Sequence, residues 1–291
     1  MNTLYLYFIE PFVEFSFMRY ALASCFCLSI SSAPIGVFLV MRRMSLMGDA
    51  MSHAVLPGAA IGYIFAGLSL PYMSIGGFIA GVLMAIFAGL ASRFTTLKED
   101  ANFAAFYLTC LALGVLLVSM HGGNVDLLNL LFGSVLGVDK IALLLVTSVA
   151  TISLTLLAIM YRPLMLESID PVFLKAVNGK GGLWHVLFLM LVVINLVAGF
   201  QALGTLMSVG LMMLPAITAR LWVQSMGKIL LLATLIALLS ATGGLLLSYH
   251  HEYPSGPAII LLCGCFYLFS LLFGQYGGVI ARYFRTKHHV N

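Results

Sequence analysis

Charged side chains are scarce in this sequence. Lys, Arg, Asp and Glu make up 8% of the 291 residues, whereas hydrophobic residues make up 62%. Soluble domains carry about 25% charged residues, so this chain lacks the polar surface that a globular protein of its size needs in water. Its apolar residues fall into runs of about 20, the length that a helix needs to cross the hydrocarbon core of a bilayer. The composition therefore excludes a soluble domain and predicts an all-α, polytopic transmembrane helical bundle.

A phosphate-binding loop and a zinc-protease motif are also absent. No G-x-x-x-x-G-K-[ST] pattern occurs, so we expect the chain neither to bind nor to hydrolyse ATP. The pair His251-Glu252 is followed by Ser255 where the HExxH signature of zinc proteases requires its second His. Alternating segments of about ten residues, typical of outer-membrane barrels, are missing as well. We therefore expect a helical membrane protein that is not an enzyme.

The apolar runs divide the chain into about eight or nine predicted spans, separated by clusters of charged residues, glycine and proline. Residues 1–16 contain two glutamates and a proline, which favours an interfacial helix over a further span. The predicted organisation is an N-terminal interfacial segment (1–16), one transmembrane domain (17–281) and a short tail (282–291). The predicted spans are 17–41, 48–68, 72–95, 101–120, 136–162, 183–201, 202–222, 229–249 and 256–280.

Basic residues gather on one side of this predicted topology. When the loop after the first span is placed in the cytoplasm, only Arg19 and Lys140 remain on the outer side. Cytoplasmic loops carry an excess of Lys and Arg, so the C-terminus is predicted inside and the N-terminus outside. The net charge of +4 therefore indicates anchoring at the membrane and no nucleic-acid partner. The inner residues are Arg42, Arg43, Arg93, Lys98, Arg162, Lys175, Lys180, Arg220, Lys228, Arg282, Arg285 and Lys287.

Asp49 and His53 lie at the start of the second predicted span, where ionisable side chains are costly to insert into a bilayer. Their i, i+4 spacing places both side chains on one helical face. Carboxylate oxygen and imidazole nitrogen both bind divalent transition metals at roughly 2.0–2.2 Å, so one ion is able to bridge the pair. The alternative is that Asp49 only complements the helix dipole and accepts a hydrogen bond from His53.

A second polar cluster, His250, His251 and Glu252, follows the eighth predicted span on the outer side. His121 and Asp126 lie in another predicted outer loop. We interpret these residues as a possible rim that attracts an incoming cation. The alternative is that they are ordinary solvated side chains at the membrane surface.

The longest hydrophilic stretch, residues 161–182, falls on the predicted cytoplasmic side. Asp170 followed by Pro171 is a helix-start signal, and an Asn-Gly pair ending at Gly179 is a stop signal. A short capped helix over 172–177 at the inner surface suits docking to a soluble partner. An ordinary connecting loop is the alternative.

Residues 43–58 (RMSLMGDAMSHAVLPG) strongly resemble the signature of a known family. These are the permease subunits of ATP-binding-cassette (ABC) importers for zinc, manganese and iron. The resemblance recurs at 129–134, 169–171, 214–220 and 248–259, in the same order along nearly the whole chain. The Gly-Asp-Ala-x-Ser-His core is its most specific part.

The resemblance implies one half of a two-subunit pore with a type II importer fold, surrounded by lipid in the bacterial cytoplasmic (inner) membrane. Cytoplasmic ATP-binding subunits would drive it, an extracytoplasmic metal-binding protein would supply the ion, and the second permease would be an identical or related chain. Asp49 and His53 occupy the metal-path positions, while Zn²⁺, Mn²⁺ or Fe²⁺ is substrate and no cofactor is bound permanently. The rim with two histidines favours zinc. The resemblance also implies that the cytoplasmic loop 164–182 contacts the ATPase, and the implied coupling residues in it are Asp170, Pro171, Phe173, Lys175 and Gly179.

Transport by alternating access is the mechanism expected of such a permease. An ion-coupled secondary transporter is the first alternative, although it would show inverted repeats and more charges near the midplane. An intramembrane metalloenzyme is the second, although it would need at least three converging ligands, and only the pair Asp49 and His53 is clearly placed.

Overall fold

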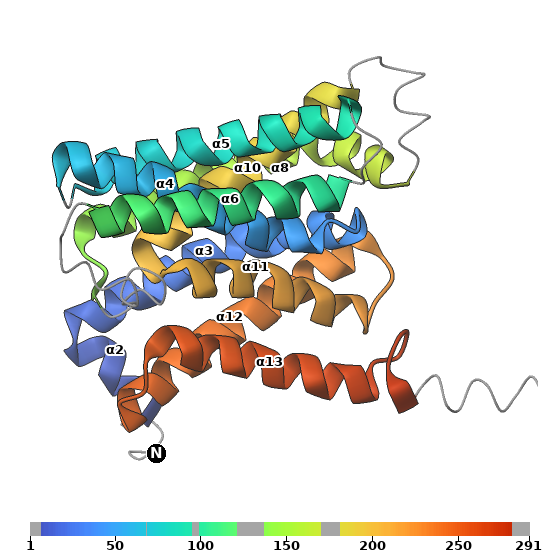
Figure 1. The fold of residues 1–291 in the computed structure, drawn as a ribbon. Helices are drawn as coiled ribbons and strands as arrows, with labels where there is room; N and C mark the ends of the chain where they lie inside the picture. Colours follow the sequence, from blue (N-terminus) through green and yellow to red (C-terminus); the bar gives the residue numbers. More distant parts are fainter. Residues whose placement is uncertain (1–6, 68, 95–98, 121–136, 170–180, 281–291) are drawn as a thin grey trace, which may run out of the picture.

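A computed structural model describes residues 7–67, 69–94, 99–120, 137–169 and 181–280, and all regular structure in these ranges is helical (Figure 1). The predicted all-α class is confirmed. The helices are α2 (Glu10–Glu14), α3 (Ser16–Met41), α4 (Ser45–Ala66), α5 (Leu70–Phe94), α6 (Glu99–Met120), α8 (Lys140–Ile169), α10 (Gly181–Leu203), α11 (Thr205–Arg220), α12 (Met226–His251) and α13 (Ser255–Phe273).

Each predicted span corresponds to one long helix in the described part of the chain, from α3 to α13. Six of them are both long and apolar enough to cross a membrane: α3, α5, α8, α10, α12 and α13. α11 and the apolar part of α6 are shorter than 18 residues, and α4, which carries Asp49 and His53, is not among the six. The chain is therefore a multi-pass membrane protein, and the count of eight or nine crossings stays a prediction.

Successive long helices run back and forth between the two ends of the bundle (Figure 1). The α3–α4 and α11–α12 turns lie at one end, on the right of Figure 1, and the α4–α5, α10–α11 and α12–α13 connections lie at the other. Arg42, Arg43 and Arg220 stand at the first end, at or beside these turns. This alternation is the arrangement that the predicted inward bias of basic residues requires.

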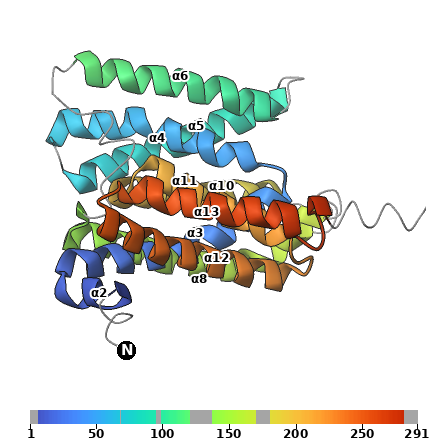
Figure 2. The ribbon, with the colours of Figure 1, turned by 90° about the horizontal axis from the view of Figure 1, so that it is seen from below.

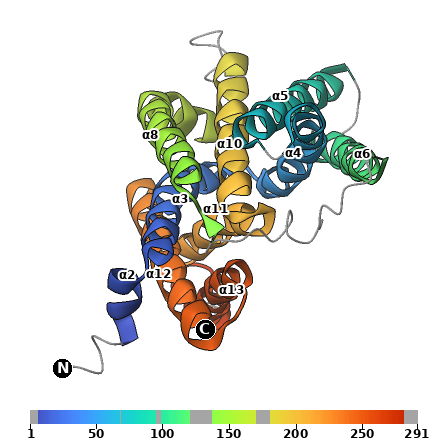
Figure 3. The same cartoon turned by 90° about the vertical axis from the view of Figure 1, so that its left-hand side faces the viewer.

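The helices form two groups joined by α10 and α11 (Figures 2 and 3). α4 packs chiefly against α5 and α6, whereas α3 packs against α8, α11 and α12, and α13 against α11 and α12. α4 and α5 approach so closely at Gly58 that a side chain there would collide with the backbone carbonyl of Gly76. Small residues allow this kind of backbone contact between membrane helices. α11 contacts helices of both groups, and its neighbours are α3, α4, α10, α12 and α13.

The end of α8 differs from the prediction. The fifth span was predicted to stop at 162, but α8 continues through Pro163 to Ile169. Leu164 is fully buried, and the Ser168 hydroxyl donates a hydrogen bond to the Leu164 carbonyl at 2.7 Å. The first part of the predicted cytoplasmic loop is therefore helical, because its apolar face packs into the bundle.

Candidate metal-translocation site

The turn that leads into α4 has a tight, regular geometry. The amide of Met44 donates to the carbonyl of Leu39 at 2.9 Å, and the amide of Arg43 donates to the carbonyl of Val40 at 3.2 Å. Arg43 has a φ of 61°. This pattern is a Schellman motif, which usually has glycine at the left-handed position. α3 therefore ends and α4 begins within three residues, and the direction of α4 is fixed by the end of α3.

Asp49 and His53 lie on the same face of α4, as predicted. The Oδ1 atom of Asp49 is 3.7 Å from Nε2 of His53, and their side chains are 59% and 23% exposed, respectively. The hydroxyl of Ser52 donates to the backbone carbonyl of Asp49 at 2.7 Å, so it stays close to the helix. The second ring nitrogen of His53, Nδ1, is buried and has no hydrogen-bond partner within the described residues. The Asp49 carboxylate is thus the accessible member of the pair.

Both side chains line a cavity of about 380 Å³ between α4, α11 and α13. Its walls are mostly apolar, so the carboxylate and the imidazole are its two strong metal ligands in the described residues. A space of this size accommodates a cation with several of its waters. The lining residues are Asp49, Ser52, His53, Thr205, Leu206, Val209, Gly210, Met213, Leu214 and Ile260.

Met213 and Thr205 of α11 were not predicted as site residues. Met213 packs against the turn that carries Asp49, and a Cβ placed on Gly48 would lie 2.5 Å from its terminal methyl group. The sequence held one indirect signal, because Met213 directly precedes the Leu-Pro-Ala segment that matches the family pattern. Apolar residues in an apolar span do not otherwise differ from those that only fill the core.

The described residues of the predicted outer rim, His250, His251 and Glu252, do not line this cavity. His250 stacks on Tyr7 with ring centroids 3.8 Å apart, and its Nε2 lies 2.9 Å from the Tyr7 carbonyl oxygen. His251 stacks on Tyr253 at 5.5 Å, and Glu252 is exposed at the turn before α13. Among the described residues, no group of three or more His, Cys, Asp or Glu side chains is arranged to hold a metal ion. His121 and Asp126 lie outside the described residues.

The predicted ATPase-coupling residues, Asp170, Pro171, Phe173, Lys175 and Gly179, also lie outside the described residues. The helices on either side are described: α8 ends at Ile169 and α10 begins at Gly181. Arg220, the last residue of α11, donates from Nη1 to the carbonyl of Val40 at 3.4 Å. The 214–220 segment therefore contacts the turn that precedes residues 43–58.

The described part of the chain is thus a bundle of membrane-length helices in which a carboxylate–imidazole pair lines a partly open cavity. A model described as "ABC 3 transport family" matches residues 14–274, and the chain belongs to this family. The predicted resemblance to permease subunits of metal ABC importers is confirmed. The chain is a transport subunit of the bacterial inner membrane rather than an enzyme.

Named relatives cover nearly the whole chain. "Manganese transport system membrane protein MntC" of Halalkalibacterium halodurans is 32% identical over 97% of this chain and 95% of its own. "Chelated iron transport system membrane protein YfeD" of Yersinia pestis is 29% identical over 94% and 91%. A solved structure, "PsaBC from Streptococcus pneumoniae in complex with Fab", matches with a TM-score of 0.84 and 30% identity, covering 99% of this chain and 100% of the other.

Proposed function

We propose that this chain is the membrane pathway of an ATP-driven importer that carries a divalent transition metal into the cytoplasm by alternating access. The observation that carries the proposal is the pairing of Asp49 with His53 on one face of α4, at 3.7 Å and in a cavity of about 380 Å³. Both are good metal ligands, and an isolated structural pair would not need a cavity beside it.

The pair suits an ion that binds briefly and leaves again. A closed tetrahedral cage of four protein ligands is typical of structural zinc sites. Here one chain supplies two strong ligands, and the 59% exposure of the Asp49 side chain leaves it open to water. Water and a second chain would complete the coordination shell. Such a site is able to exchange its ion within a transport cycle.

A second permease chain is part of the proposal, because it would shield the exposed Asp49 carboxylate from lipid. An aspartate that faces lipid at the centre of a helix costs about 2.5–3.5 kcal/mol. Asp49 lines the cavity bordered by α4, α11 and α13, and its side chain is 59% exposed on that side. An identical or paired permease on this side would enclose the carboxylates of both chains in a common pathway.

ATP-binding subunits and an extracytoplasmic metal-binding protein complete the proposed importer. We propose that Asp170, Pro171, Phe173, Lys175 and Gly179 contact the ATPase at the inner surface. Their flanking helices α8 and α10 end and begin on the side where Arg42, Arg43 and Arg220 lie. The binding protein would dock at the opposite end.

We propose Mn²⁺ as the first substrate, with Fe²⁺ and Zn²⁺ as competitors. The relatives given above are named for manganese and for chelated iron. The sequence-based preference for zinc depended on the outer histidines, and His250 instead contacts Tyr7. One carboxylate and one imidazole are compatible with all three ions.

The test is metal uptake by cells that depend on this importer, with Asp49→Ala, His53→Ala and the control His251→Ala. His251 is a histidine outside the cavity, so its loss controls for the removal of any imidazole. We expect both α4 variants to lose uptake of radioactive Mn²⁺ while the control retains it. Near-normal uptake in both α4 variants would refute the proposed site, and uptake that persists without the ATP-binding subunit would favour a secondary transporter.

A further inference from the structure

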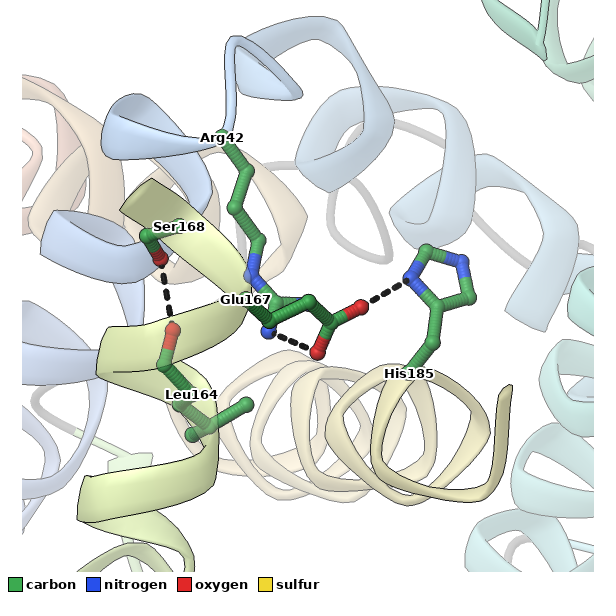
Figure 4. A network of polar contacts seen from close by, with 5 residues as sticks. All are labelled: Arg42, Leu164, Glu167, Ser168 and His185. Atoms are coloured by element: carbon green, nitrogen blue, oxygen red, sulfur yellow. Dashed lines mark hydrogen bonds and ion pairs between the residues drawn. The ribbon is translucent and has the colours of Figure 1, made fainter. Parts of the chain in front are cut away.

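A buried ionic network joins the ends of three helices at the end of the bundle where α4 begins (Figure 4). Nη2 of Arg42, at the end of α3, lies 2.6 Å from Oε2 of Glu167 on α8. The other carboxylate oxygen of Glu167 lies 3.6 Å from Nδ1 of His185 on α10. The side chains of Arg42 and Glu167 are only 5% and 14% exposed. One oxygen of Glu167 therefore binds Arg42 of α3, and the other lies beside His185 of α10.

Aromatic rings pack around the arginine. The guanidinium carbon of Arg42 lies 4.6 Å from the centre of the Phe188 ring on α10. Phe38, one turn earlier on α3, makes edge contacts with Phe188 at 6.3 Å and with Tyr161 of α8 at 6.0 Å. A cation over an aromatic face and a carboxylate within hydrogen-bond distance together fix the guanidinium plane. The arginine is thus held by α8 and α10 at once.

This network stands between two regions that the proposed function assigns to different tasks. Arg42 is the C-cap of α3, and it precedes Asp49 by seven residues through the tight α3–α4 turn. Glu167 precedes residue 170, the first of the predicted coupling residues, by three positions. His185 lies in the first turns of α10, just after that segment. A displacement of the ends of α8 and α10 would therefore act directly on the start of the metal-binding helix.

We propose that Arg42 and Glu167 are a positioning pair that links the movement of α8 and α10 at the inner surface to the orientation of α4. The inference rests on the proposed function, and it names the residues that transmit the movement caused by ATP binding and hydrolysis to α4. Neither residue touches the metal, because neither lines the Asp49 cavity. A buried pair that only stabilised the fold would be equally well replaced by apolar side chains. The linking role predicts that such a replacement folds but works poorly.

The central experiment uses the double variant Arg42→Met/Glu167→Leu in the complete importer, reconstituted in liposomes with its ATP-binding subunits and metal-binding protein. Removing both charges together avoids a lone buried ion, so the protein is expected to fold. Two rates are measured on each preparation: metal-stimulated ATP hydrolysis and Mn²⁺ transport. We expect hydrolysis to continue while the number of ions moved per ATP falls by about 2- to 30-fold, the range known for coupling residues.

Lys228→Met is the matched control, because it removes an exposed positive charge from the start of α12, near the same end of the bundle. We expect its transport per ATP to equal that of the wild type. The swapped variant Arg42→Glu/Glu167→Arg restores an ion pair and should recover part of the lost coupling. If the apolar double variant fails to accumulate, Glu167→Asp, which keeps the buried charge balanced but shortens the side chain that links the helices, is measured in its place, with the same expectation.

The outcomes separate this inference from the function on which it rests. Wild-type transport per ATP in the apolar double variant would overturn the positioning role and leave the metal pathway intact. No metal transport by the wild-type complex would instead refute the proposed function. A parallel fall in hydrolysis and transport, with an unchanged ratio, would mean that the pair only supports the fold.

Discussion

Two acid–base pairs, one within α4 and one between the end of α3 and α8, have opposite environments. Asp49 and His53 face a cavity at 3.7 Å, with the carboxylate 59% exposed. Arg42 and Glu167 meet at 2.6 Å and are almost fully buried. An ion in transit needs ligands that are accessible and incompletely satisfied, whereas a joint between helices needs partners that stay together. The environment of each pair, more than its residue types, therefore indicates its task.

The largest expected effect comes from breaking the buried pair on one side only. In Arg42→Met the Glu167 carboxylate loses its nearest cation, and removing one partner of a buried ion pair costs about 3–5 kcal/mol. We expect a strongly lowered unfolding temperature in detergent and poor accumulation in the membrane. Asp49→Asn, which alters an exposed carboxylate, is expected to change stability by no more than about 0.5 kcal/mol in the same assay. Equal destabilisation by Arg42→Met and Asp49→Asn would contradict the proposed difference in environment between the two pairs.

For metal transport, we expect Asp49→Asn to have the larger effect of these two variants. Asp49→Asn keeps the shape of the side chain but removes the anionic ligand that the ion would meet first. Changes around metal sites typically cost about 10- to 100-fold in affinity or activity, and we expect a loss of uptake at least of this size. Uptake of radioactive Mn²⁺ at several external concentrations measures it. A variant with unchanged uptake at low metal would show that Asp49 does not contact the ion.

Local sequence patterns predicted the helices well but missed what joins them. Apolar runs of span length located each long helix that the structure describes between residues 16 and 273, because bilayer thickness sets the length of each run. The prediction ended the fifth span at 162, before the end of α8 at Ile169, because Arg162, Pro163 and Glu167 are typical of a loop when viewed alone. The carboxylate of Glu167 is paired in its buried position with Arg42, which is 125 positions away in the chain. A contact between residues so far apart in the sequence cannot be predicted from a local sequence pattern.

The site was predicted in part for the same reason. Asp49 and His53 were detectable because inserting ionisable residues into a bilayer costs free energy, so such residues in an apolar span indicate a functional site. Met213 and Thr205 were not, because nothing in their own span distinguishes them from residues that fill the core. They enter the site only through the packing of α11 against α4.

Gly48 allows a sharper test of how α11 shapes the cavity. A methyl group there meets the terminal methyl of Met213 at 2.5 Å, and this flexible end is able to move aside into the cavity. We expect Gly48→Ala to cost less than the about 1–3 kcal/mol typical of overpacking, while Mn²⁺ uptake falls severalfold. Gly227→Ala is the matched control, since a Cβ there meets nothing within 4 Å. Normal uptake by Gly48→Ala would mean that the space beside Met213 is not part of the pathway.

The smallest effect is expected at the outer histidines. His250 is held by stacking on Tyr7 and by a 2.9 Å contact between its Nε2 and the Tyr7 carbonyl oxygen, so its side chain is already engaged within the protein. It does not line the Asp49 cavity. His250→Phe preserves the stacked ring and removes both nitrogens, and we expect Mn²⁺ and Zn²⁺ uptake to stay within about twofold of the wild type, as for surface changes away from a site. A selective loss of Zn²⁺ uptake would restore the outer rim as a metal-binding element, and would extend the metal-exchanging role from the Asp49 pair to a second region at the opposite end of the bundle.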